Sequence, residues 1–215
     1  MVRPLAVRHR EYVRRPLNVL LGAPSHIAIL RTLHASGTGM TGRQIARMSG
    51  VAVQATHDAL ARFEEIGLVH WLAVGRAHLY QLNHDHYLFA KGILPLLEAE
   101  QEFRTRIKAI LRRTLEGHVI SAVIFGSTAR GDDRPDSDLD LLLIVEQRKD
   151  REKAQDRADA AFDRLKKEFG VTLSAISFGR GEFVAGYQKG KSFFQTVVKE
   201  GETVAGKELS EVIRG

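Results

Sequence analysis

The sequence contains no cysteine, no long apolar run and no internal repeat. The absence of cysteine excludes disulfide bonds and thiolate metal sites. No apolar run approaches the roughly 20 residues that span a bilayer, and the Arg-rich start lacks the apolar region and cleavage site of a signal peptide. The chain of 215 residues is long enough for one large domain or two small ones. We therefore expect a cytoplasmic protein without a membrane partner.

Positive charge is concentrated in the first part of the chain. Residues 1–90 hold 10 Lys and Arg against 5 Asp and Glu, whereas residues 91–215 hold 22 against 21. A basic surface attracts polyanions such as nucleic acids. The asymmetry favours a phosphate-rich partner for the N-terminal part, although basic surfaces of this size also occur in proteins without such a partner.

Helical patterns and a hairpin pattern follow one another within residues 25–83. The stretch "SHIAILRTLHAS" predicts a core helix that begins at Ser25 as its N-cap. The stretch "TGRQIARMSGVAVQATHDALARFEEIGLV" predicts two amphipathic helices on either side of Gly50, which is the helix-turn-helix pattern. Next, "LVHWLAVGRAHLYQLN" predicts two short strands that reverse near Gly75 and Arg76.

This order of elements resembles the MarR- and ArsR-like winged-helix regulators. The resemblance implies that the second helix of the motif lies in the DNA major groove, while the hairpin contacts the backbone. Base edges would then be contacted by Gln54, Thr56 and His57, and phosphates by Arg62 and Arg76. A module that binds protein instead of DNA has the same pattern, so that alternative stays open.

A helical connector is predicted at residues 91–117. Apolar residues recur there at helical spacing, and Gly117 is a natural C-terminal stop. We expect an α+β protein in which a winged helix-turn-helix domain at residues 1–90 precedes this connector and a second domain occupies residues 118–215.

Two predicted strands and their connection form the most informative stretch of the chain. The first, "HVISAVIF", ends at Gly126 and Ser127, and the second, "LDLLLIV", is apolar at both parities, like a central strand buried on both faces. Only ten residues separate Ser127 from Asp138, which is short for a parallel crossover. We therefore expect antiparallel neighbours that bring Gly126 and Ser127 beside Asp138 and Asp140.

Asp138 and Asp140 are two residues apart, so on a strand their side chains leave the same face about 6.5–7 Å apart. Two such carboxylates repel each other unless a cation joins them, and Mg²⁺ binds one or two carboxylates together with phosphate oxygens. Gly126 allows a phosphate to approach the backbone, and Ser127 offers a hydroxyl at a helix N-terminus. The pattern predicts a site for a metal-bound triphosphate. The alternative, a solvated acidic loop, is our interpretation for Asp132, Asp133 and Asp136.

The stretch "GSTARGDDRPDSDLDLLLIV" resembles the Gly-Ser, Arg-Gly and Asp-x-Asp elements of the minimal nucleotidyltransferases of the DNA polymerase β superfamily, which include kanamycin nucleotidyltransferase. The resemblance covers about residues 100–207 and implies a nucleotidyltransferase-fold α/β domain with a mixed sheet. It implies that Gly126, Ser127 and Arg130 bind a nucleoside triphosphate (NTP). It also implies that Asp138 and Asp140 are catalytic and bind Mg²⁺ or Mn²⁺, so that an acceptor hydroxyl attacks the α-phosphorus.

One element of that family is missing. Active members supply a third carboxylate from a later strand, whereas the corresponding strand here, "VTLSAISF", carries Thr172 and Ser174 and no acid. The helix predicted in the closing stretch "KGKSFFQTVVKEGETVAG" is interpreted as structural.

The intact Gly-Ser and Asp-x-Asp elements favour a nucleotidyltransferase enzyme with an unknown acceptor, such as a protein side chain. The missing acid favours a transcription regulator whose second domain senses nucleotide. A third alternative is an antitoxin-like partner of a toxin. The sequence leaves open whether the protein is a homodimer.

Overall fold

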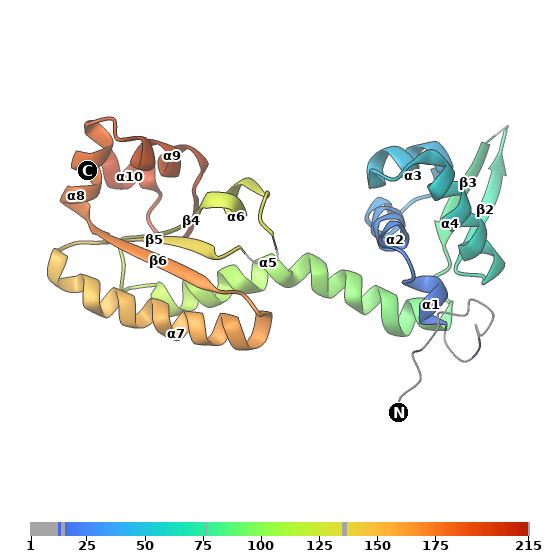
Figure 1. Ribbon diagram of the computed structural model, residues 1–215, viewed down its shortest axis with the longest axis horizontal. Coiled ribbons are helices and arrows are strands. Elements are labelled where there is room, and N and C mark those ends of the chain that lie inside the picture. Colours follow the sequence, from blue (N-terminus) through green and yellow to red (C-terminus); the bar gives the residue numbers. More distant parts are fainter. Residues whose placement is uncertain (1–12, 14–15, 76, 135–136, 215) are drawn as a thin grey trace, which may run out of the picture. The chain divides into compact units, whose positions relative to one another are not determined.

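The computed structural model describes residues 13, 16–75, 77–134 and 137–214. The chain divides into two compact units, Met1–Gln101 and Glu102–Gly215, called here the N-terminal and C-terminal units. The boundary falls inside helix α5 (Leu94–Leu115), so the predicted connector is largely one helix that contributes to both units (Figure 1). Arg76 and Asp136, named in the sequence interpretation, lie outside the described residues.

The N-terminal unit follows the predicted order of helices and hairpin (Figure 1). Strands β2 and β3 form the hairpin, and the short β1 pairs with β3, so that the sheet order is β1-β3-β2. The elements are α1 (Leu17–Leu20), α2 (Pro24–Ser36), β1 (Met40–Thr41), α3 (Gly42–Ser49), α4 (Val53–Glu65), β2 (Val69–Val74), β3 (Ala77–Leu82) and the π-helix η1 (Phe89–Ile93).

Local signals determine where these helices begin. Helix α2 starts one residue before the predicted N-cap Ser25, because Pro24 occupies its first turn and Ala23 is the N-cap. Proline suits this position since its missing N–H would have no partner within the helix. Helix α3 begins with a capping box, in which the Thr41 hydroxyl accepts from the Gln44 amide at 3.3 Å and the Thr41 amide donates to Gln44 Oε1 at 2.9 Å.

The C-terminal unit contains a four-stranded sheet in the order β6-β5-β4-β7. Strand β5 pairs antiparallel with β4, as predicted, and parallel with β6 after the α7 crossover. The sheet is therefore mixed. The elements after α5 are β4 (Ser121–Phe125), α6 (Gly126–Arg130), β5 (Leu139–Val145), the 3-10 helix η2 (Arg148–Asp150), α7 (Arg151–Phe169), β6 (Leu173–Gly179), α8 (Arg180–Gln188), α9 (Ser192–Glu200), β7 (Glu202–Gly206) and α10 (Leu209–Arg214).

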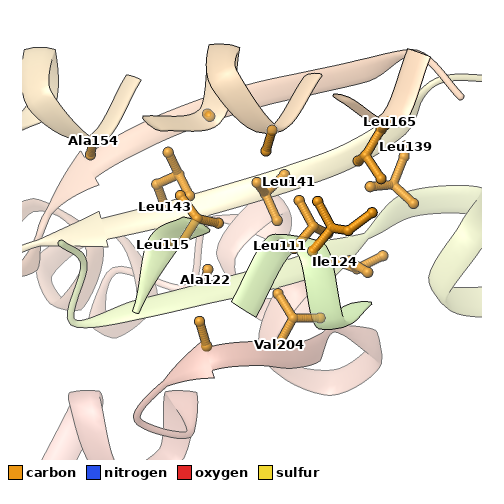
Figure 2. Close-up of a cluster of buried hydrophobic side chains, with 14 of the residues drawn as sticks. Leu111, Leu115, Ala122, Ile124, Leu139, Leu141, Leu143, Ala154, Leu165 and Val204 are labelled. Carbon is orange, nitrogen blue, oxygen red and sulfur yellow. The ribbon is translucent and has the colours of Figure 1, made fainter. Parts of the chain in front are cut away.

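Helices cover both faces of this sheet because β5 is apolar at both parities. Leu139, Leu141 and Leu143 pack with residues of α5 and α7 (Figure 2). Leu142 and Ile144 pack on the other face with residues of α8, α9 and α10. The two faces are called here the α5/α7 face and the α8–α10 face. Within the described parts of the chain, no helix combines the length and apolar character needed to cross a membrane.

Candidate functional site

The acidic pair lies at the start of the central strand β5. Asp138 precedes the strand and is exposed, whereas Asp140 is its second residue and is half-buried. Alternate residues of a strand point to opposite faces, so Asp140 shares a face with Leu142 and Ile144. The candidate site therefore lies on the α8–α10 face, at the edge where β5 begins and β4 ends.

Gly126 brings the Gly-Ser turn against this acidic pair. Strand β4 ends at Phe125, which is the register partner of Asp140, and Gly126 follows with φ of 73°. A Cβ atom added to Gly126 would lie 2.2 Å from Asp140 Oδ2. Glycine is needed here for two reasons, since the left-handed backbone disfavours other residues and the Asp140 carboxylate occupies the space of a side chain.

The surroundings of Asp140 disfavour the charged form of its carboxylate. Burial raises the pKa of Asp140 above the ordinary aspartate value, and the charge of Asp138 raises it further. Arg130 lowers this pKa and so offsets part of the effect. The raised pKa means that ionising Asp140 carries a cost in the folded protein, which a bound cation would remove.

Arg130, the last residue of α6, lies near two acidic side chains. Its Nε lies 3.3 Å from Asp132 Oδ2, and its Nη1 lies 3.8 Å from Glu200 Oε2 on α9. A cavity of about 300 Å³ lies between these elements, and its lining includes Gly126, Arg130 and Glu200. The guanidinium group, which is half-exposed, can therefore contact an anion beside the Gly-Ser turn.

Helix α9 supplies a wall of this cavity that sequence reasoning missed. Ser192, Thr196 and Glu200 line the cavity together with Phe193. The three polar residues recur every four positions, so they form one stripe on a helix that buries Phe194 and Val197. The spacing of these polar residues is the sequence signal that indicates a second role for the helix. The helix, which the sequence analysis interprets as structural, also lines the candidate site.

Ser174 occupies the position beside Asp140 on the next strand. The two residues are register partners in the parallel pair β5 and β6. Thr172, the other residue considered for this position, lies before β6, and its hydroxyl accepts from Lys166 Nζ at 3.1 Å. Two nearby acids form ion pairs elsewhere, Glu168 with Arg164 and Glu182 with Arg151. A hydroxyl, not a carboxylate, therefore stands beside Asp140 on the neighbouring strand.

The donor set fits a divalent ion that arrives with phosphate oxygens. Among the described residues, no group of three or more His, Cys, Asp or Glu side chains is placed to hold a metal ion. Asp138 and Asp140 supply two carboxylates, and Mg²⁺ commonly binds one or two together with substrate phosphates.

The predicted DNA-contacting residues of the N-terminal unit separate into two groups on α4. Gln54, His57 and Arg62 are exposed, and Gln54 Nε2 donates to Asp58 Oδ1 at 2.9 Å. Thr56 is fully buried, and its hydroxyl donates to the Ala52 carbonyl at 3.1 Å. Its assignment to base contact is wrong because Thr56 lies on the same helical stripe as Leu60 and Phe63, which is the core side of α4.

Comparisons with known proteins bear on the C-terminal unit. The family model described as the nucleotidyltransferase domain matches residues 104–196. Among solved structures, the archaeal chromatin protein TrmBL2, described as showing a novel mode of DNA binding, is 17% identical over 86% of this chain and 76% of its own, with a TM-score of 0.28. No curated protein matches the chain. The chain therefore contains a nucleotidyltransferase-family domain at residues 104–196.

Proposed function

We propose that the C-terminal unit binds a nucleoside triphosphate at the Gly126-Ser127 turn and transfers its nucleotidyl group to an acceptor hydroxyl. One observation carries this proposal. The Gly126 backbone lies against the Asp140 carboxylate, so both halves of the Gly-Ser and Asp-x-Asp pattern share one edge of the sheet. The matching family model supports the same reaction class.

Each residue of the site has a distinct role in this proposal. Gly126 has no side chain, so a phosphate reaches the backbone N–H groups beside it. The Ser127 hydroxyl donates to a phosphate oxygen, and the Arg130 guanidinium offsets negative charge on the triphosphate. The cavity of about 300 Å³ beside α9 is at the lower limit of ligand-site volumes, and it accommodates the nucleoside.

Asp138 and Asp140 would hold Mg²⁺ or Mn²⁺, which when bound offsets phosphate charge and activates the attacking hydroxyl. In the reaction the acceptor oxygen forms a bond to the α-phosphorus and the hydroxyl proton passes to solvent. The bond from that phosphorus to the oxygen bridging the β-phosphate breaks, and pyrophosphate leaves with the electron pair.

Ser174 favours a second candidate function, in which the unit binds nucleotide without transfer and so acts as a sensor for a transcription regulator. Ser174 stands beside Asp140 in the sheet, and a hydroxyl replaces a carboxylate neither as a general base nor as a charged metal ligand. Binding needs only the turn, Arg130 and the acidic pair, whereas transfer also needs activation of the acceptor.

Transfer of label from α-³²P-labelled NTPs separates these functions. With Mg²⁺ and a cell lysate, the full chain is expected to label an acceptor, and Asp138→Asn/Asp140→Asn is expected to reduce labelling at least about 100-fold. Ser174→Asp is expected to increase labelling because it restores a third carboxylate. Nucleotide binding without any transfer, in both wild type and Ser174→Asp, would establish the sensor instead.

The matched control is Asp156→Asn/Asp163→Asn, which removes two exposed acids from α7 and should leave labelling unchanged. Loss of labelling in Asp138→Asn/Asp140→Asn is not explained by unfolding. The raised pKa of Asp140 means that folding stability falls as the pH rises from the unfolded-state pKa through the folded-state pKa. Asparagine does not ionise, so it removes this fall in folding stability. The variant should therefore unfold at the same temperature as wild type or at a higher temperature.

We also propose that the N-terminal unit binds DNA through α4 and the hairpin of β2 and β3. Gln54, His57 and Arg62 are exposed on α4, the second helix of the predicted helix-turn-helix. In this proposal Gln54 and His57 contact base edges, and Arg62 and Arg76 contact phosphates. The excess of 5 positive charges in residues 1–90 suits a polyanionic partner.

Fluorescence anisotropy with a labelled random duplex measures this binding between about 50 and 200 mM salt. Arg62→Ala and Arg76→Ala are each expected to weaken binding and to reduce the slope of log affinity against log salt by about one. Arg31→Ala is the control, because Arg31 is already paired with Glu100 at 2.6 Å. Equal affinities and salt slopes for all variants and wild type would refute the phosphate contacts.

A further inference from the structure

One cavity of the C-terminal unit lies on the α5/α7 face, opposite the acidic pair. Its volume is about 490 Å³, and its floor includes Ile107 of α5, Ile124 of β4 and Leu139 of β5. These three residues are buried members of the core cluster that α5 and α7 cover. Because Leu139 lies between Asp138 and Asp140 in the strand, it points to the opposite face from Asp140.

An aromatic pair forms one apolar wall of this cavity. The rings of Phe103 on α5 and Phe169 on α7 meet edge to face with centroids 5.2 Å apart, and both residues line the cavity. Phe103 is 44% exposed, so part of its ring is available for contact with a further apolar group. The wall and the floor together offer an apolar surface to a ligand.

Positive charge dominates the polar lining. Among the residues that the structure describes, Arg104, Arg134 and Lys166 line the cavity together with one acid, Asp133. Arg104 is neutralised by Glu202, which accepts from its Nη2 at 2.7 Å. Lys166 Nζ donates to the Thr172 hydroxyl.

Neither Lys166 nor Arg134 forms an ion pair with any residue that the structure describes. Within the described part of the chain, Lys166 and Arg134 are therefore two cations without an ion pair, and they lie beside the apolar floor. Asp133 also lines the cavity, but it is not paired with either cation. This combination attracts a negative group that is attached to an apolar one.

We infer that this cavity binds a small organic anion, a carboxylate or phosphate joined to an apolar or aromatic body. The anionic group contacts Lys166 and Arg134, and the apolar body covers Phe103 and the floor. The volume is within the range of about 300–1,000 Å³ that is usual for small-molecule sites. This inference is independent of the proposed nucleotidyl transfer.

The cavity also contacts the chain segments that form the candidate active site. Its lining includes Ser137 and Leu139, which flank Asp138, and Thr128, which follows Ser127. A ligand on the α5/α7 face therefore touches residues next to both halves of the Gly-Ser and Asp-x-Asp pattern.

The fluorescent aromatic anion 8-anilinonaphthalene-1-sulfonate (ANS) tests this site in the full chain. ANS is expected to bind wild type, and Arg134→Ala/Lys166→Ala to weaken its binding about tenfold or more. Both side chains are exposed, so the variant should keep the wild-type circular dichroism spectrum. Ile107→Trp fills the floor and should also weaken binding. The controls are Arg113→Ala/Lys167→Ala, which removes two cations outside the cavity lining, and Arg130→Ala on the opposite face; both should leave the ANS affinity unchanged.

Competition identifies the head group. Displacement of ANS by octanoate assigns a carboxylate ligand, and displacement by 1-naphthyl phosphate, which is not a nucleotide, assigns a phosphate ligand. The uncharged N-phenyl-1-naphthylamine should bind at least about tenfold more weakly than ANS, because it lacks the charge that Lys166 and Arg134 attract. The inference is overturned by an ANS affinity that is equal in wild type and Arg134→Ala/Lys166→Ala, or by displacement with neither competitor. Since none of these measurements uses NTP, their failure is distinct from a failure of nucleotidyl transfer.

Discussion

Gly126→Ala is expected to lower nucleotidyl transfer about 100-fold while reducing the stability of the C-terminal unit only moderately. The φ of 73° at Gly126 costs an alanine about 1–2 kcal/mol. The new Cβ would lie 2.2 Å from Asp140 Oδ2, so the carboxylate must move away. A displacement of a reacting group by about 1 Å is sufficient for a 100-fold loss of rate.

Gly117→Ala is the matched control for this prediction. Gly117 follows α5 with φ of 76°, and a Cβ added there meets no atom within 4 Å. Both variants carry the same backbone strain, so both should lower the unfolding temperature by several degrees. Only Gly126→Ala should also lower the rate of label transfer from α-³²P-labelled NTPs. If both variants lose transfer equally, contact with Asp140 is not the reason for glycine at position 126.

Leu141→Ala is expected to destabilise the C-terminal unit by about 2–5 kcal/mol. Leu141 lies in the central strand β5, is 0% exposed, and packs in the cluster between the sheet and the helices α5 and α7 (Figure 2). Truncation leaves a cavity that these rigid elements cannot fill. Domains typically have only about 5–15 kcal/mol of stability, so the loss removes a large share.

Urea unfolding with two probes measures this loss. Far-UV circular dichroism reports both units, whereas the single tryptophan, Trp71 on β2, reports the N-terminal unit. Leu141→Ala should move the dichroism transition to lower urea and move the fluorescence transition less. Leu72→Ala, which truncates a leucine that is 55% exposed, should change stability by no more than about 0.5 kcal/mol. A Leu141→Ala effect as small as that of Leu72→Ala would show that the cluster does not stabilise the sheet.

The central part of the candidate site was predictable from local patterns. Residues 139–145 are apolar at both parities, and the ten residues between Ser127 and Asp138 are short for a parallel crossover. Both signals lie within one stretch of the chain. The first predicts a central buried strand, and the second predicts the antiparallel pairing that is observed. The Gly-Ser turn and Asp140 are neighbours because of that pairing.

Thr56 shows how a local pattern was misread. Its spacing to Leu60 and Phe63 places it on the core stripe of α4, so the sequence contained the signal for burial. The assignment of Thr56 to base contact rests on its position in the helix-turn-helix motif, whereas the helical period of α4 predicts burial. Threonine tolerates this burial because its hydroxyl bonds to the Ala52 carbonyl of the preceding turn.

Strand β7 was not predicted because its pattern is weak. Glu202–Gly206 is only five residues long, and it follows α9 directly. It becomes a strand by pairing with β4, which lies about 80 residues earlier in the chain. Such a pairing depends on the assembled sheet rather than on local propensity.

The sequence by itself determined the order of the helices and the hairpin within residues 25–83, the central position of β5 and the residue types of the Gly-Ser and Asp-x-Asp pattern. Only the tertiary structure decided that Ser174 stands beside Asp140, that Glu200 reaches Arg130 and that cavities lie on both faces of the sheet. The physical reason is that periodicity and turn chemistry act over a few residues. Register between distant strands and the packing of helices on a sheet depend on many contacts that form only when the whole unit folds.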